Sequence, residues 1–170
     1  VISCVFFEWL YNKLLHQPNT TGDLSAVVTG ILLAFNVPVS APIWMPVIGG
    51  AFSVIIVKML FGGIGKNFMN PALAGRAFMM ASWPALMTTW TRAGAELPLF
   101  GNVTVTDAIS TATPLAQLKN GALPDANFLD LFLGQTGGVI GETSALALII
   151  GGAYLVWRKV ISINIPAAYI

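Results

Sequence analysis

The chain has 170 residues, of which 56% are apolar and only 9% are charged, and its formal net charge is +1. Soluble domains carry about 25% charged residues, so the composition excludes an ordinary soluble domain and predicts an integral membrane protein. The small net charge gives no indication of a nucleic-acid partner, and we expect none. Cys4 and His16 are the single cysteine and the single histidine, which excludes an internal disulfide and supports no metal site.

The apolar residues gather in segments that predict an all-α, polytopic helix bundle forming one transmembrane domain over residues 1–170. The expected helical segments are, in chain order, Val1–Leu10, Leu24–Val37, Ile43–Phe61, Pro71–Trp90 and Ser144–Trp157, followed by an apolar run over Val160–Ile170. A spanning helix needs roughly 20 residues. The two end runs are shorter than this, so we expect the chain to be a segment of a longer polypeptide.

Residues at the ends of these segments are typical of helix termini. Asp23 or Ser25 is expected to cap the second segment, and Asn70 the fourth, where Pro71 takes the first helical position. Lys58 lies near the end of the third segment, where a long side chain can reach the membrane interface.

Charge asymmetry predicts the orientation. If the segments alternate sides, one side collects most of the basic residues: Lys13, His16, Lys58, Lys66, Arg158 and Lys159. The positive-inside rule places that side in the cytoplasm. The long loop Thr91–Gly141 is then predicted to face outward.

Two segments are too short to span the membrane without tilting and resemble each other. Leu24–Val37 follows Asp23 and Ser144–Trp157 follows Glu142, and both begin near Ser-Ala. Paired short segments of this kind indicate internal repeats with a binding site at their junction. We therefore expect an internal repeat and short helices that are candidates for re-entrant segments.

The glycine-rich turn 62–67 contains neither nucleotide-binding motif. A P-loop needs Gly-x-x-x-x-Gly-Lys-Ser/Thr, but Leu60 stands five residues before Gly65, and Asn67 follows Lys66. The simplest interpretation is a tight turn between helices. Because the turn leads to the start of the helix at Pro71, its backbone N–H groups could also receive an anion or a polar ring.

Two further features in the fourth segment allow more than one interpretation. Asn70-Pro71-Ala72 resembles the water-channel triplet, but that signature requires two copies and only one occurs here. Arg76 lies inside an apolar helix, where a charge is usually functional or paired. Glu142 or a phosphate group is its candidate partner.

The stretch Asp107–Ala116 holds three hydroxyl residues within four positions, Ser110–Thr113, immediately before Pro114. One interpretation makes Thr113 the N-cap of a short helix that runs to Lys119. The other attaches a phosphate ester to the Thr113 oxygen, at the positive end of that helix. Physical argument alone indicates an anchor suited to an anion and leaves both open.

Three stretches, taken together, carry a family resemblance: 61–77, 107–116 and 141–145. They resemble the NqrB/RnfD family, which is shared by the Na⁺-translocating NADH:quinone reductase and the Rnf complex, an ion-translocating electron transport complex. Residues 110–116 are similar to the RnfD branch in particular.

The resemblance implies that FMN is joined through its phosphate to Thr113, the last residue of the Ser-x-Ala-Thr core that includes Ser110 and Ala112. It implies that a flavin transferase recognises Asp107 during maturation. Contacts to this flavin, or to a second, noncovalent flavin such as riboflavin, are predicted for Asn70, Arg76, Gly65 and Lys66. The helices offer aromatic and sulfur contacts to the ring at Phe68, Met69, Phe78 and Trp83. The alternative for each of these residues is a place in the core or on the lipid-facing surface.

The resemblance also implies a function: a membrane subunit of a ferredoxin:NAD⁺ oxidoreductase (Rnf) complex that relays electrons and is coupled to Na⁺ or H⁺ transport. The expected partners are the other membrane and peripheral subunits, including an outward-facing subunit that bears FMN, and the lipid bilayer of a prokaryotic cytoplasmic (inner) membrane. The alternatives are the NqrB subunit of the quinone reductase and, in another class, a solute channel without flavin.

Overall fold

The structure, a computed structural model, describes residues 1–90, 114–121, 123, 127–139 and 141–169. In these residues the regular structure is helical, with one isolated antiparallel bridge between Pro38 and Val139. The expectation of an all-α chain is confirmed for this part. The elements are α1 (Ile2–Leu14), η1 (Thr21–Asp23), α2 (Ser25–Phe35), α3 (Trp44–Ala51), η2 (Phe52–Met59), α4 (Pro71–Ser82), α5 (Pro84–Met87), α6 (Pro114–Lys119), α7 (Phe128–Leu133), α8 (Ala145–Trp157) and α9 (Asn164–Tyr169).

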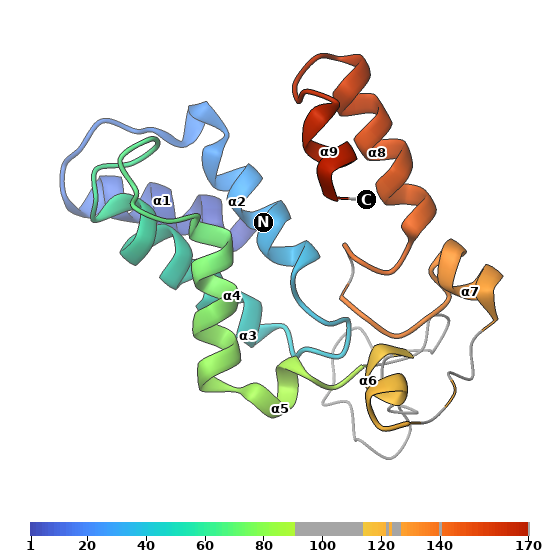
Figure 1. Cartoon of the computed structure of the whole chain (residues 1–170). Helices are drawn as coiled ribbons and strands as arrows, with labels where there is room; N and C mark the ends of the chain where they lie inside the picture. Colours follow the sequence, from blue (N-terminus) through green and yellow to red (C-terminus); the bar gives the residue numbers. More distant parts are fainter. Residues whose placement is uncertain (91–113, 122, 124–126, 140, 170) are drawn as a thin grey trace.

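Helices α1 to α4 pack together into a bundle, with α5 at one end of it (Figure 1). Its buried apolar residues form two clusters. The first joins α2, α3, α4 and α5 through Leu33, Val37, Met45, Ala72, Met79 and Met87, and the second joins α1, α2 and η2 through Cys4, Ala26, Val54 and Met59. This bundle is the packed part of the chain that positions the candidate site.

Helices α8 and α9 stand apart from this bundle in Figure 1. The segment before α8 is joined to the C-terminal end of α2, because the Gly141 N–H donates to the Phe35 carbonyl at 3.0 Å, next to the bridge between Pro38 and Val139. Ser144 caps α8, accepting from the Ala147 N–H at 3.2 Å. The predicted helix at this place is confirmed.

The third predicted segment is a single helical rod that changes its type part-way. Helix α3 continues directly into η2, an eight-residue π-helix whose pattern extends past its end: the Leu60 N–H donates to Ile55 and the Gly63 N–H to Lys58. The side-chain hydroxyl of Ser53 donates to the Gly49 carbonyl at 2.8 Å. π-helical turns are rare in proteins, and those that occur are often found at functional sites.

The predicted C-terminal end of the fourth segment is wrong. We expected a helix up to Trp90, but α4 ends at Ser82 and the short α5 begins at Pro84. Pro84 has no N–H to donate and restricts the residue before it to extended conformations. Trp83 accordingly leaves the helix, with φ −136° and ψ 63°.

The first segment was predicted too short, since α1 continues past Leu10 to Leu14. Within the expected long loop 91–141, α6 begins at Pro114 and ends at Lys119 as predicted, and α7 is an addition. Across the residues that the structure describes, no single helix has both the length and the apolarity that crossing a bilayer requires.

Candidate functional site

A polar pocket of about 310 Å³ opens on the bundle. The start of α2, the last turn of η2, the glycine turn and the start of α4 contribute to it, so segments far apart in the sequence line one pocket. Its lining consists of Asp23, Ser25, Val28, Thr29, Leu32, Lys58, Ile64, Asn67, Asn70 and Pro71. Two amides, two hydroxyls, one carboxylate and one ammonium group therefore surround a cavity with apolar walls.

Asn70 occupies the position that the sequence predicted for it. Its side-chain oxygen accepts from the backbone N–H groups of Ala72 at 2.9 Å and Leu73 at 3.3 Å, and Pro71 takes the first helical position. This cap fixes where α4 begins and holds the Asn70 carboxamide at the pocket. Asn67 is held by its own side-chain donation to the Met69 carbonyl at 2.7 Å.

The glycine turn is built as the sequence predicted, because Gly62, Gly63 and Gly65 all have positive φ, at 100°, 92° and 79°. Gly65 and Lys66 belong to this turn but not to the residues that line the pocket. The Lys66 side chain folds back over Gly62, with its Cδ 2.9 Å from where a Cβ on Gly62 would stand. The contacts of Gly65 and Lys66 to a flavin stay predictions.

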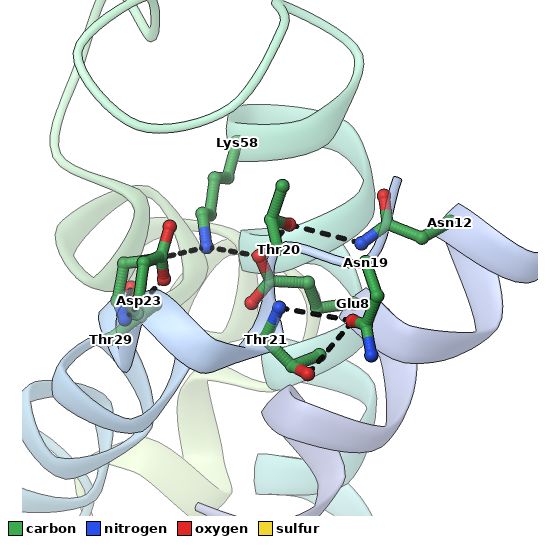
Figure 2. Close-up of polar contacts among 9 residues, drawn as sticks. Glu8, Asn12, Asn19, Thr20, Thr21, Asp23, Thr29 and Lys58 are labelled. Carbon is green, nitrogen blue, oxygen red and sulfur yellow. Dashed lines mark hydrogen bonds and ion pairs between the residues drawn. The ribbon is translucent and has the colours of Figure 1, made fainter. Parts of the chain in front are cut away.

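A buried ion pair lies in the wall of the pocket (Figure 2). The Lys58 ammonium is 2.9 Å from Oε1 of Glu8, with side-chain exposures of 3% and 0%. Thr20 donates its hydroxyl to the same Glu8 oxygen at 2.6 Å and accepts from the Asn12 amide at 3.0 Å. Lys58 also donates to the Ser25 hydroxyl, which joins the pair to the pocket.

The sequence did not reveal this pair, and the expected position of Lys58 at the membrane interface is wrong. Lys58 is buried because Glu8, fifty positions away, supplies the opposite charge inside the bundle. The signal that could have found the pair is the presence of one acid and one base in otherwise apolar segments. Neither residue's partner is visible locally.

The network leaves two buried acceptors without a partner among the described residues, Oε2 of Glu8 and Oδ1 of Asn12. Buried polar groups are hydrogen-bonded in the great majority of cases, and an unpaired one costs about 1–3 kcal/mol. Apolar side chains of the same volume would fill this part of the core without that loss of stability, so the polar network is better explained by a function than by stability.

Asp23 places a second carboxylate at the rim. The prediction that Asp23 or Ser25 caps α2 is wrong, because Leu24 occupies the N-cap position and α2 has no side-chain cap hydrogen bond. Asp23 instead accepts from the Ser25 N–H at 2.8 Å and from the Ser25 hydroxyl. Slight burial raises the pKa of the Asp23 carboxyl, but these hydrogen bonds and the Lys58 charge outweigh it and hold the pKa below its usual value. Asp23 is thus negative at neutral pH.

Arg76 does not line this pocket and instead joins three segments. Its Nη1 donates to Oδ1 of Asn36 at 2.7 Å and lies 3.6 Å from Oε1 of Glu142. The predicted pairing with Glu142 is confirmed. Because Asn36 ends α2 and Glu142 precedes α8, Arg76 ties the bundle to the C-terminal segment. Its contact to a cofactor phosphate stays a prediction.

An apolar groove of about 350 Å³ lies elsewhere on η2 and α4. Three of the four predicted ring contacts line it: Phe68, Met69 and Phe78. Phe78 stacks on Phe52 with ring centroids 4.4 Å apart. Trp83 instead packs edge-on against Trp44 at 5.0 Å.

The predicted attachment stretch lies outside the described residues. This applies to Asp107, Ser110, Ala112 and Thr113, and the described chain resumes at Pro114, the first residue of α6.

The model of the NQR2, RnfD, RnfE family matches residues 1–170. The chain belongs to this family. It is 53% identical over 175 residues to the D component of the Na⁺-translocating ferredoxin:NAD⁺ oxidoreductase complex of Acetobacterium woodii, with 100% of this chain and 51% of that protein covered. It is 39% identical over 183 residues to the D component of the proton-translocating complex of Clostridium ljungdahlii, covering 100% and 52%.

A third relative belongs to the other branch. The B component of the Na⁺-translocating NADH-quinone reductase of Neisseria meningitidis serogroup B is 41% identical over 152 residues, covering 82% of this chain and 34% of that protein. This family member thus spans about half the length of the two relatives from ferredoxin complexes.

Proposed function

We propose that this chain is part of the RnfD subunit of an ion-translocating ferredoxin:NAD⁺ oxidoreductase complex in a prokaryotic cytoplasmic membrane. The observation that carries the proposal is the 53% identity over the whole chain to a protein of that description. The lower identity of the quinone-reductase relative, 41% over 152 residues against 53% over 175 residues, favours the ferredoxin complex over that alternative. The partners are then the other membrane and peripheral subunits, including an outward-facing one that carries FMN.

Within that function, we propose that Thr113 carries covalent FMN through a phosphoester, and that a flavin transferase recognises Asp107 when it attaches the group. The support is the Ser-x-Ala-Thr core at 110–113 and the family membership. Residues 91–141 form the outward-facing attachment loop in this proposal. FMN supplies one- and two-electron chemistry, and the chain supplies its position and surroundings.

A second, noncovalent flavin such as riboflavin is proposed for the polar pocket. The residues present fit such a group. The volume of about 310 Å³ is at the lower end of the range for small-molecule sites, about 300–1,000 Å³. Apolar walls at Val28 and Leu32 suit the faces of a flat ring system, and Asn67 and Asn70 offer amides to its polar edge.

The covalent attachment is tested by mass spectrometry of the denatured, full-length subunit after tryptic digestion. The peptide 93–119, released by cleavage after Arg92 and Lys119, is expected to carry the added mass of an FMN phosphoester. Thr113→Ala should remove that mass, and the matched variant Thr111→Ala should keep it. An unmodified wild-type peptide, from cells with an active flavin transferase, contradicts the covalent attachment. It would favour the alternative hypothesis of a solute channel without flavin.

A further inference from the structure

The ion pair between Glu8 and Lys58 is joined directly to the polar pocket. Lys58 is among the residues that line the pocket, and it donates to Ser25, which also lines it. On its other side Lys58 meets Glu8, at 2.9 Å in the interior of the bundle. One positive charge therefore lies between a buried carboxylate and the residues that line the cavity. Figure 2 shows Lys58 in contact with Glu8.

Stability alone gives a weak account of this arrangement. A buried ion pair is often no more stabilising than apolar residues of the same volume, because both charges lose their hydration. Here the lost hydration of Glu8 is only partly replaced by protein hydrogen bonds, since its Oε2 has no partner among the described residues. A charge kept in such a place acts strongly on anything that binds nearby, because the low dielectric of the interior screens it little.

The local backbone is built to place Lys58 there. Lys58 lies in the last turn of the π-helix η2, whose wider turn presents its side chains at different angles from those of an α-helix. Thr20, from the segment between α1 and α2, holds the Glu8 carboxylate with a hydrogen bond of 2.6 Å. Glu8 is thus held by segments that do not line the pocket, whereas Lys58 is held both by Glu8 and by Ser25, which lines it.

We propose that Glu8 and Lys58 together set the reduction potential of the flavin ring bound in the polar pocket, and are positioning residues for it. The inference rests on the second flavin of the proposed function. Two electrons from a reductant, taken up with one proton from solvent, would leave a bound ring one charge more negative, and the Lys58 ammonium would stabilise that charge. Glu8 opposes the effect and keeps Lys58 in place. No proton moves to or from either residue.

The proposal predicts the direction in which each variant shifts the reduction potential of the bound ring, whereas a purely structural role of the ion pair predicts no such direction. Lys58→Met removes a positive charge, so the reduced ring loses stabilisation and its potential should fall. Glu8→Gln removes a negative charge, so the potential should rise. Both changes break the same ion pair, and damage to the fold would therefore move both variants in the same direction. The double variant should return close to the wild-type potential.

The experiment uses the full-length subunit in detergent, in a Thr113→Ala background that removes the proposed covalent FMN, with riboflavin as the probe. Spectroelectrochemical titration measures the midpoint potential of bound riboflavin. Each single variant is expected to change the ratio of reduced to oxidised ring at a given potential at least tenfold, which is about 30 mV for a two-electron couple. Lys13→Met, an exposed lysine on the same helix as Glu8, is the matched control and should leave the potential unchanged.

Asp23→Asn provides a second test if either buried variant fails to fold. Asp23 lines the same pocket and is exposed, so its replacement is tolerated more easily, and loss of its negative charge should raise the potential. Shifts of the same sign in Lys58→Met and Glu8→Gln, or no shift in any of the three, overturn the inference but leave the second flavin standing. Failure of riboflavin to bind the wild-type pocket overturns both, while the Thr113 peptide still decides the covalent FMN.

Discussion

The crossing of α4 over the rod formed by α3 and η2 depends on the absence of a side chain at Gly75. A Cβ at this position would lie 2.0 Å from Oγ of Ser53 and 3.0 Å from the carbonyl oxygen of Gly49. The second contact is with backbone and cannot be relieved by a rotamer change. Gly75→Ala must therefore push α4 away from its neighbour or distort the rod.

Two effects of opposite sign set the magnitude. Replacing glycine by alanine inside a helix gains up to about 1 kcal/mol from helix propensity. Overpacking in a well-packed core costs about 1–3 kcal/mol, occasionally more. Because the 2.0 Å contact is far below van der Waals distance, we expect overpacking to win and the variant to be destabilised by about 2 kcal/mol.

Thermal unfolding of the full-length subunit in detergent, followed by circular dichroism, measures the effect. Gly22→Ala is the matched control, because nothing lies within 4 Å of a Cβ at that position; its effect should stay within about 0.5 kcal/mol. The double variant Ser53→Ala/Gly75→Ala should recover part of the loss, since the nearest obstacle is gone. Equal melting temperatures for Gly75→Ala and Gly22→Ala would refute the close crossing.

Two further predictions concern side chains whose positions were expected from the sequence. Asn70→Ala removes the cap from α4 and should cost about 1 kcal/mol, with Asn70→Asp, another good cap, close to wild type in the same unfolding assay. Glu142→Gln should cost less than about 1 kcal/mol, because its ion pair with Arg76 is exposed and long at 3.6 Å. Arg76→Gln should cost more, since it also removes the hydrogen bond to Asn36; an equal loss in both variants would contradict this.

The proposed roles divide between two parts of the chain. The polar pocket and the Glu8–Lys58 pair belong to the described bundle, whereas the attachment stretch 107–113 is argued from sequence and family alone. The two proposals can therefore fail independently. A chain with a modified Thr113 and no riboflavin in the pocket would still be a flavin-bearing subunit.

Features governed by neighbouring residues were predicted correctly. Asn70 caps α4, the glycines of the turn adopt positive φ, and α6 begins at Pro114. Each depends on a hydrogen bond or a backbone preference that acts within a few positions of the chain. The two short helices α2 and α8, which the sequence suggested are related by a repeat, differ at their N-termini. At α2, Asp23 accepts from the Ser25 N–H, whereas the Ser144 side chain caps α8 by accepting from the Ala147 N–H. The internal repeat stays a prediction.

The pairing of Arg76 with Glu142 shows how far such arguments reach. A charge inside an apolar segment must find a partner, and Glu142 was a candidate for that reason. The same rule, applied to Glu8 and Lys58, would have suggested a pair, but Lys58 lay near a predicted helix end and was assigned to the interface. Position along a helix is a local property, whereas burial depends on what packs against that helix.

By itself the sequence determined the all-helical character of the described residues, the Asn70 cap of α4 and the glycine turn, because short-range hydrogen bonds and dihedral preferences decide these. The tertiary structure alone decided that Lys58 is buried against Glu8, that η2 is π-helical, and that Asp23, Asn67 and Asn70 share one pocket. These outcomes depend on contacts between residues up to fifty positions apart. Such contacts arise only when the packing of several helices has fixed which charges lose access to solvent.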